Sequence, residues 1–185
     1  MAKFINKKPF IIAEISANHN GSFLRASKLI KLAKKSGADA VKLQTYTPDM
    51  MTIKKNNFMI KSGLWKNYNL WKLYKEACTP LEWHKKLFSL AKKLKLKIFS
   101  TPFNIDGLNF LEKLNCPAYK VSSFEMNDLN LIKKIAKTKK SMIISTGLAN
   151  LDEIKKTYKV AVQSGCKDIT LLYCVSNYPS NIDDF

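Results

Sequence analysis

Arginine and histidine are nearly absent from this chain. Of its 32 basic residues only Arg25 is an arginine, and the two histidines are His19 and His84. A net charge of +18 would ordinarily suggest a nucleic-acid partner. However, the lysines are spread over segments of helical period, and no basic cluster is interleaved with aromatic residues. The composition therefore predicts lysines on solvated helix faces and no nucleic-acid binding, and it is compatible with an anionic small substrate.

Paired cysteine motifs and long apolar runs are also lacking. The four cysteines show neither CxxC nor metal-ligand spacing, which predicts free thiols. No apolar run approaches the roughly 20 residues of a membrane span, and residues 1–8 show no apolar core followed by a cleavage site. We therefore expect no signal peptide, no membrane partner and a cytoplasmic protein. With two distant histidines, a metal site built from this segment alone would be poor in nitrogen ligands. The cysteines are Cys78, Cys116, Cys166 and Cys174.

Apolar, strand-like runs alternate with segments of helical period along the whole chain. This alternation predicts a parallel sheet with right-handed crossovers. Gly37 and Gly165 stand where a helix ends before the next strand, and no Gly-rich fingerprint follows the first strand, so a (β/α) barrel is favoured over a doubly wound sheet. Since such a barrel needs eight strands, we expect an incomplete (β/α)8 TIM barrel of about six βα units that ends after strand 6. The predicted strands are residues 11–16, 40–45, 97–101, 118–123, 141–146 and 169–174.

The rest of the chain is organised around residues 10–21. This stretch starts with the composition of a strand buried on both faces, and Ser22 follows as a predicted helix N-cap. Glu14 lies inside the apolar run, on the same side as Ser16. A buried carboxylate is costly unless it has a partner or a catalytic task. The alternative to a catalytic Glu14 is a glutamate satisfied by a neighbouring lysine.

A long insert, residues 46–78, separates the second predicted strand from the next helix. It carries several aromatic residues and three methionines, and loops of this length in compact domains are usually functional or mobile. We interpret it as a loop that covers substrate; packing against the barrel end is the alternative. The aromatic residues named for this prediction are Trp65, Tyr68, Trp71 and Tyr74.

Polar residues gather at the carboxyl ends of the predicted strands. Lys42 and Gln44 share one face of the second strand, and Lys120 points inward from the fourth. Two inward lysines repel each other unless an anion lies between them, so the pattern predicts a phosphate or phospho-carboxylate site. The alternative is a buried lysine that only pairs with Glu14 or Glu125. Hydroxyls able to donate to the same anion are those of Thr101, Ser123, Ser145 and Ser176.

These stretches resemble the sialic acid synthase family, enzymes that condense phosphoenolpyruvate with an amino sugar. The match is carried by residues 13–21, 41–45, 100–103, 119–125 and 145–147, and by Cys174 with residues 178–179. Residues 63–65, 73–80 and 83–84 are similar to the branch that makes pseudaminic acid. The resemblance implies condensation of phosphoenolpyruvate with a 6-deoxy diacetamido hexose, with phosphate released by C–O cleavage. The alternatives are N-acetylneuraminate or legionaminic acid synthesis.

The resemblance also implies an architecture, a cofactor and residue roles. The family fold is a (β/α)8 barrel followed by a small antifreeze-like domain, so residues 1–185 would be the N-terminal part of a protein that is a homodimer when full length. The divalent metal (Mn²⁺, Mg²⁺ or Co²⁺) is held by two histidines on the last strands, which are absent here; neither His19 nor His84 matches them. Ser176 stands where the family often carries asparagine. The implied phosphate contacts are Lys42, Thr101, Lys120, Ser123, Ser145 and Ser176, and the implied sugar-side residues are Glu14, Gln44, Glu125 and Tyr178.

In the implied mechanism the metal polarises the sugar aldehyde. The enol carbon of phosphoenolpyruvate attacks it, water adds at the phosphate-bearing carbon, and phosphate departs. Glu14, Lys120 and Glu125 are the predicted catalytic residues, and Glu14 would stabilise the cationic carbon or position the water. Two rivals remain open: a Schiff-base aldolase that uses Lys120 as nucleophile, and an inactive anion-binding remnant.

Overall fold

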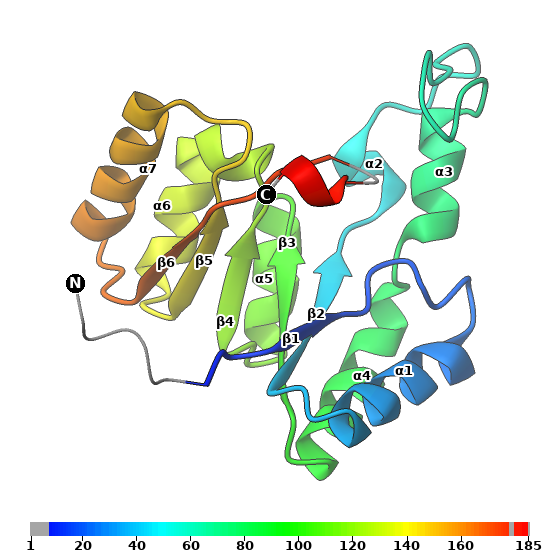
Figure 1. The fold of residues 1–185 in the computed structure, drawn as a ribbon, viewed down its shortest axis with the longest axis horizontal. Coiled ribbons are helices and arrows are strands. Elements are labelled where there is room, and N and C mark those ends of the chain that lie inside the picture. Colours follow the sequence, from blue (N-terminus) through cyan, green and yellow to red (C-terminus); the bar gives the residue numbers. More distant parts are fainter. Residues whose placement is uncertain (1–7, 178–179, 185) are drawn as a thin grey trace.

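The computed structural model, which describes residues 8–177 and 180–184, is a curved half-barrel of parallel strands. The strands lie in chain order, each hydrogen-bonded in parallel to its neighbours along the sheet. The predicted parallel topology and six βα units are therefore confirmed (Figure 1). The strands are β1 (Ile12–Glu14), β2 (Ala40–Thr45), β3 (Lys97–Pro102), β4 (Ala118–Val121), β5 (Ser141–Ser145) and β6 (Ile169–Leu172).

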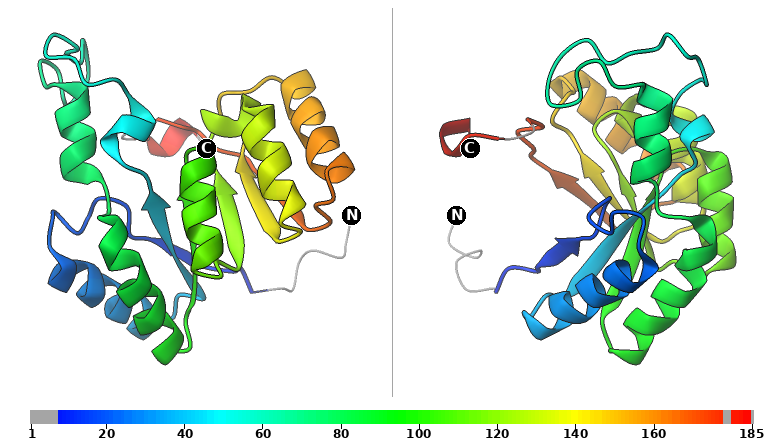
Figure 2. Two further views of the ribbon diagram at one scale, coloured as in Figure 1. Left: turned by 180° about the vertical axis from the view of Figure 1, so that it is seen from behind. Right: turned by 90° about the vertical axis from the view of Figure 1, so that its right-hand side faces the viewer.

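The helices cover the convex side of the sheet, and the concave side is open between β1 and β6 (Figure 2). Crossover helices join consecutive strands, as a parallel ladder requires. Among the described residues, no helix is long and apolar enough to cross a membrane. The helices are α1 (Phe23–Lys35), α2 (Pro48–Met51), α3 (Leu70–Ala77), α4 (Leu81–Lys93), α5 (Ile105–Lys113), α6 (Leu129–Lys137) and α7 (Leu151–Gln163), with 3₁₀ turns η1 (Glu125–Asn127) and η2 (Ile182–Asp184).

Local sequence signals begin and end these elements. The Ser22 side chain accepts a hydrogen bond from the Arg25 backbone N–H at 3.2 Å, so the predicted N-cap of α1 is confirmed. Gly37 and Gly165 adopt φ angles of +84° and +103° where α1 and α7 end. Residues other than glycine rarely adopt this backbone conformation, which explains why glycine occupies both positions.

Alternation along β2 separates the core from the concave face. Val41 and Leu43 are fully buried against α1 and α4, while Lys42 and Gln44 lie on the opposite face. A second apolar cluster, which includes Tyr119 and Leu131, joins β4 and β5 to α5, α6 and α7. The sheet therefore has an apolar face toward the helices and a face carrying polar side chains on its concave side.

The expectation that the first strand is buried on both faces was wrong. Ile12 is 37% exposed, and the Glu14 side chain is 40% exposed. The reason is positional: β1 pairs only with β2 among the described strands, so nothing in this part of the chain covers its inner face. The predicted strands also extended too far at their carboxyl ends. β4 ends at Val121 and β6 at Leu172, and the polar residues beyond them lie in the loops that follow.

The insert is packed on the carboxyl end of the half-barrel. The Tyr46 ring lies edge-to-face against Tyr74 of α3 (5.9 Å between centroids) and against Phe103 after β3 (5.2 Å). Trp71 of α3 donates from Nε1 to Asp49 of α2 at 2.8 Å. These contacts match the packing alternative, while a substrate-covering role for the insert stays a prediction.

Candidate active site

Lys42 links two neighbouring strands at the concave face. Its Nζ forms an ion pair with Glu14 of β1 and donates to Thr101 Oγ1 of β3 at 3.2 Å. Register explains the first contact, because Glu14 and Lys42 are direct partners in the parallel ladder. The ion pair with a neighbouring lysine, weighed as the alternative for Glu14, is therefore present, while a catalytic role for Glu14 stays a prediction. The carboxylate stays half-exposed on the open face.

The second Glu14 oxygen is oriented by the backbone of its own loop. The Ser16 N–H donates to Glu14 Oε1 at 2.9 Å, and Ser16 Oγ donates to Gln44 Oε1 at 3.2 Å. Ser16 adopts a φ of +43°, in the left-handed region that costs energy for a serine. The result joins Glu14, Ser16 and Gln44 into one polar group beside Lys42.

Lys120 is the most deeply buried charged side chain of the site. Only 9% of the residue is exposed, and its Nζ donates to the Val121 carbonyl at 2.8 Å and to Ser145 Oγ of β5. Burial, together with repulsion from the Lys42 ammonium, lowers the pKa of Lys120 to about 8. Because the described residues hold no carboxylate in an ion pair with it, an incoming anion would stabilise its charged form.

The end of β6 brings further polar groups to the same place. Ser123 Oγ and Ser176 Oγ are 3.5 Å apart, and Cys174 Sγ donates to Ser145 Oγ at 3.2 Å. A Cβ on Gly147 would clash with Ser176 Oγ, so the loop after β5 packs closely against the segment that carries Ser176. These contacts bring together the residues that we call the lysine–hydroxyl cluster: Lys42, Thr101, Lys120, Ser123, Ser145 and Ser176.

Glu125 lies in η1, directly after β4. Its Oε2 is buried and has no hydrogen-bond partner among the described residues. Burial raises the pKa of Glu125, against the opposing effect of Lys120. The Glu125 charge in turn helps to raise the pKa of Tyr74 in the insert helix α3, after burial of that phenol. An orphaned acceptor of this kind is suited to a substrate hydroxyl or amide.

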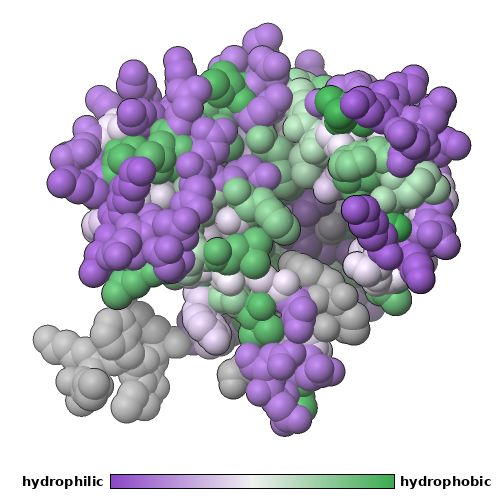
Figure 3. All heavy atoms as spheres, turned by 90° about the horizontal axis from the view of Figure 1, so that it is seen from above, coloured by the Kyte–Doolittle hydropathy of each residue, from purple (hydrophilic) through white to green (hydrophobic). Residues whose placement is uncertain are grey.

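The structure thus gathers most of the predicted site residues at the carboxyl ends of β1 to β6. Tyr178, the remaining sugar-side prediction, lies outside the described residues. Cys174 was not predicted as a site residue, because its relevance comes from a tertiary contact to Ser145. Seen from above, onto the strand ends, the molecule is hollowed near its centre; hydrophobic side chains border part of the hollow, and hydrophilic side chains lie mostly toward the outer edge of this view (Figure 3).

Both histidines have structural partners. His84 Nε2 is 2.9 Å from Thr45 Oγ1, and Nδ1 is 3.1 Å from the Pro80 carbonyl, on the helix side of β2. His19 is fully buried, with Nε2 3.3 Å from Thr79 Oγ1. Burial lowers the pKa of both histidines. No group of three or more His, Cys, Asp or Glu side chains in the described part of the chain is placed to hold a metal.

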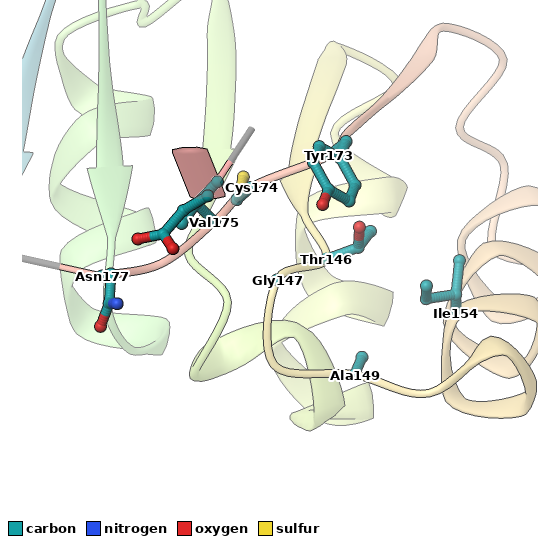
Figure 4. A pocket seen from close by; sticks show the side chains of 9 residues that line it. Thr146, Gly147, Ala149, Ile154, Tyr173, Cys174, Val175 and Asn177 are labelled. Carbon is teal, nitrogen blue, oxygen red and sulfur yellow. The ribbon is translucent and has the colours of Figure 1, made fainter. Parts of the chain in front are cut away.

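A cavity of about 530 Å³ is lined in part by Cys174, whose thiol contacts Ser145 of the lysine–hydroxyl cluster. Figure 4 shows Thr146 and Gly147 on the loop after β5, facing Cys174 and Val175 on the segment after β6. The remaining lining residues are Ala149, Ile154, Tyr173, Asn177 and Asp184.

Comparisons with known proteins agree with this arrangement. A model of the NeuB family matches residues 29–185. The chain is 51% identical over 178 residues to pseudaminic acid synthase of Helicobacter pylori, covering 95% of this chain and 52% of that protein. It is 47% identical over 181 residues to pseudaminic acid synthase of Campylobacter jejuni, covering 97% and 53%. The chain therefore spans about half the length of these curated relatives.

The fold is also found in solved structures. The crystal structure of N-acetylneuraminic acid (sialic acid) synthetase from Leptospira borgpetersenii, in complex with citrate, superposes with a TM-score of 0.83 at 27% identity. The match covers 96% of this chain and 58% of that one. The half-barrel described above thus corresponds to a little over half of that structure.

Proposed function

The chain belongs to the NeuB family, and from this premise we propose that the complete protein condenses phosphoenolpyruvate with an amino sugar to give a nonulosonic acid. The observation that carries the proposal is the lysine–hydroxyl cluster, in which Lys42 and Lys120 reach the concave face from alternate strands. Two ammonium groups among hydroxyl donors suit a small, highly charged anion. Phosphoenolpyruvate is such an anion.

In this proposal the cluster binds the phosphate end of phosphoenolpyruvate. Lys120, with a pKa lowered to about 8 by burial and by Lys42, regains a favourable environment for its charge when the phosphate arrives. Lys42 and Thr101, already in contact at 3.2 Å, contribute from β2 and β3. Each charge-assisted contact is worth about 1.5–3 kcal/mol, so loss of one lysine would weaken binding substantially.

Glu14 and Glu125 are proposed to act at the reacting carbons. A C–C bond forms between the enol carbon of phosphoenolpyruvate and the sugar aldehyde carbon, and the π electrons of the aldehyde C=O bond move to its oxygen, which takes up a proton. Cationic character is left on the carbon that carries phosphate. Water adds to that carbon, and the C–O bond to phosphate breaks with the electron pair leaving on phosphate. Glu14, which pairs with Lys42, would stabilise the cation or accept the water proton. Glu125, whose buried Oε2 has no partner, and Gln44 would contact the sugar.

The sugar substrate is proposed to be a 6-deoxy diacetamido hexose, which makes the complete protein a pseudaminic acid synthase. Support comes from the similarity of this chain to two pseudaminic acid synthases, at 51% and 47% identity. An N-acetylneuraminate or legionaminic acid synthase is the alternative. Homodimerisation and a cytoplasmic location stay predictions.

A divalent metal is implied by the family resemblance, but the residues of this chain do not fit a metal site. His19 and His84 are engaged with Thr79 and Thr45, and the described residues contain no cluster of metal-ligating side chains. We therefore derive no step through a metal. Its ligands are expected in the part of the protein that corresponds to the remaining half of the relatives.

The test is a product assay on the complete protein. Phosphate release is measured with phosphoenolpyruvate and either a 6-deoxy diacetamido hexose or N-acetylmannosamine, with a divalent cation present. The proposal expects phosphate and a nonulosonic acid in equal amounts, with the diacetamido sugar preferred. Absence of phosphate release with every amino sugar would refute it. Borohydride trapping of substrate on Lys120 would instead support the Schiff-base aldolase.

A further inference from the structure

Cys174 touches the lysine–hydroxyl cluster but has no role in the proposed reaction. We infer that Cys174 is a positioning residue, which turns the Ser145 hydroxyl toward the phosphate of phosphoenolpyruvate; this inference rests on the proposed function. Cys174 Sγ is 3.2 Å from Ser145 Oγ, and the same oxygen receives an N–H from Lys120. The thiol therefore contacts the group that contacts the buried lysine.

The Ser145 hydroxyl has few hydrogen-bonding positions. A hydroxyl has two acceptor lone pairs and one proton. Lys120 donates to one lone pair and the Cys174 thiol to the other. With both acceptor positions filled, the only free capacity of Ser145 is its own O–H, which is left to donate to an anion. If one lone pair were free, the Ser145 hydroxyl could rotate so that its proton pointed away from the anion. The Cys174 thiol, by occupying that lone pair, excludes this rotamer.

Close packing of the backbone fixes the thiol at this distance. A Cβ added at Gly147 would lie 2.6 Å from the Cys174 carbonyl oxygen and 3.0 Å from Cys174 Cβ, so the loop after β5 meets the chain after β6 with no room for a side chain. The Leu172 carbonyl, 3.6 Å from Cys174 Sγ, is a second acceptor for the same thiol proton. The shorter contact to Ser145 favours donation there.

These two hydrogen-bond patterns predict effects of opposite sign. If the thiol donates to Ser145, Cys174→Ala frees a lone pair and raises KM for phosphoenolpyruvate by about three- to tenfold, the size expected for one modest hydrogen bond. If the thiol donates to Leu172, Ser145 donates to sulfur, and the same variant releases that proton to the phosphate and lowers KM. Cys174→Ser keeps a donor at this position and should rescue the wild-type value.

The experiment measures kcat and both KM values for wild type, Cys174→Ala and Cys174→Ser in the complete protein. We expect the alanine variant alone to show a raised KM for phosphoenolpyruvate, with kcat and the sugar KM unchanged. An unchanged or lowered KM, or an equal loss in the serine variant, would overturn the inference. A wild-type protein that does not turn over phosphoenolpyruvate would refute the proposed function itself, a distinguishable result.

A second readout does not depend on the variants folding. Cys174 and Cys78 are both partly exposed, while Cys116 and Cys166 are buried. Iodoacetamide labelling of wild type, located by peptide mass analysis, should be slowed at Cys174 by saturating phosphoenolpyruvate and unchanged at Cys78 in the insert. Equal labelling of Cys174 with and without phosphoenolpyruvate would overturn the inference, since a purely structural cysteine would not respond to this ligand.

Discussion

Replacing Lys120 by methionine should stabilise the ligand-free protein and weaken its binding of phosphoenolpyruvate. At pH 7 the Lys120 ammonium is buried, and its pKa of about 8, against 10.5 in the unfolded chain, means that folding disfavours its charge. A difference of this size corresponds to a cost on the order of 3 kcal/mol. Methionine removes that cost but loses the hydrogen bonds to Val121 and Ser145, about 1 kcal/mol each. A net gain of about 1 kcal/mol should raise Tm by roughly 2–4 °C.

The affinity of Lys120→Met for phosphoenolpyruvate should fall, although its stability rises. Loss of one charge-assisted contact to phosphate predicts a Kd for phosphoenolpyruvate raised by roughly ten- to a hundredfold. Differential scanning fluorimetry of the complete protein, with and without phosphoenolpyruvate, reports both effects in one assay. Lys140→Met is the matched control. Lys140 Nζ lies 2.6 Å from Glu112 Oε1, and this ion pair is not on the concave face. A lowered Tm with an undiminished ligand shift in Lys120→Met would refute the reasoning.

Four further outcomes are expected. Phosphoenolpyruvate affinity, measured by titration calorimetry, should fall as pH rises through about 8, because Lys120 then loses the proton that attracts phosphate; a flat profile from pH 7 to 10 would contradict this. Glu14→Gln should lower kcat by about a hundredfold or more while leaving the Kd for phosphoenolpyruvate within a few fold, as removal of an acid–base group predicts; retained turnover would exclude the role. Tyr74→Phe, which removes a phenol whose pKa is raised by burial and by the Glu125 charge, should raise the sugar KM a few fold with the KM for phosphoenolpyruvate unchanged, and the reverse pattern would exclude a role of Tyr74 on the sugar side. Thr45→Val should cost about 1–3 kcal/mol in the free energy of unfolding, because buried His84 Nε2 loses its partner, with both KM values unchanged; a shifted KM would show that this pair belongs to the site.

Much of the fold was predictable because the hydrophobic period and the composition of a segment determine its secondary structure locally. The alternation of β2 separates Val41 and Leu43 from Lys42 and Gln44, and this follows from strand geometry alone. The exposure of Glu14 was not predictable in this way, because burial of β1 depends on strands that the described chain does not contain.

The candidate site was predictable in its residue types but not in its contacts. Lysines and hydroxyls at strand ends indicated an anion site, while the pairing of Lys120 with Ser145 depends on register between β4 and β5. Cys174 stood in the family resemblance without an assigned role, and its contact with Ser145 arises only where β6 ends beside β5. The packing of Tyr74 in the insert against Tyr46 could not be predicted from the periodicity of the sequence.

The central claim, that the complete protein uses this cluster to break the C–O bond of phosphoenolpyruvate, is tested most directly by isotope transfer. Phosphoenolpyruvate labelled with ¹⁸O at the bridging oxygen is turned over with the amino sugar, and the products are examined by mass spectrometry. Our account predicts that the label leaves with inorganic phosphate, because water attacks carbon and the bridging oxygen departs with phosphorus. Label retained in the sugar acid, with unlabelled phosphate, would mean cleavage of the P–O bond and would contradict the account.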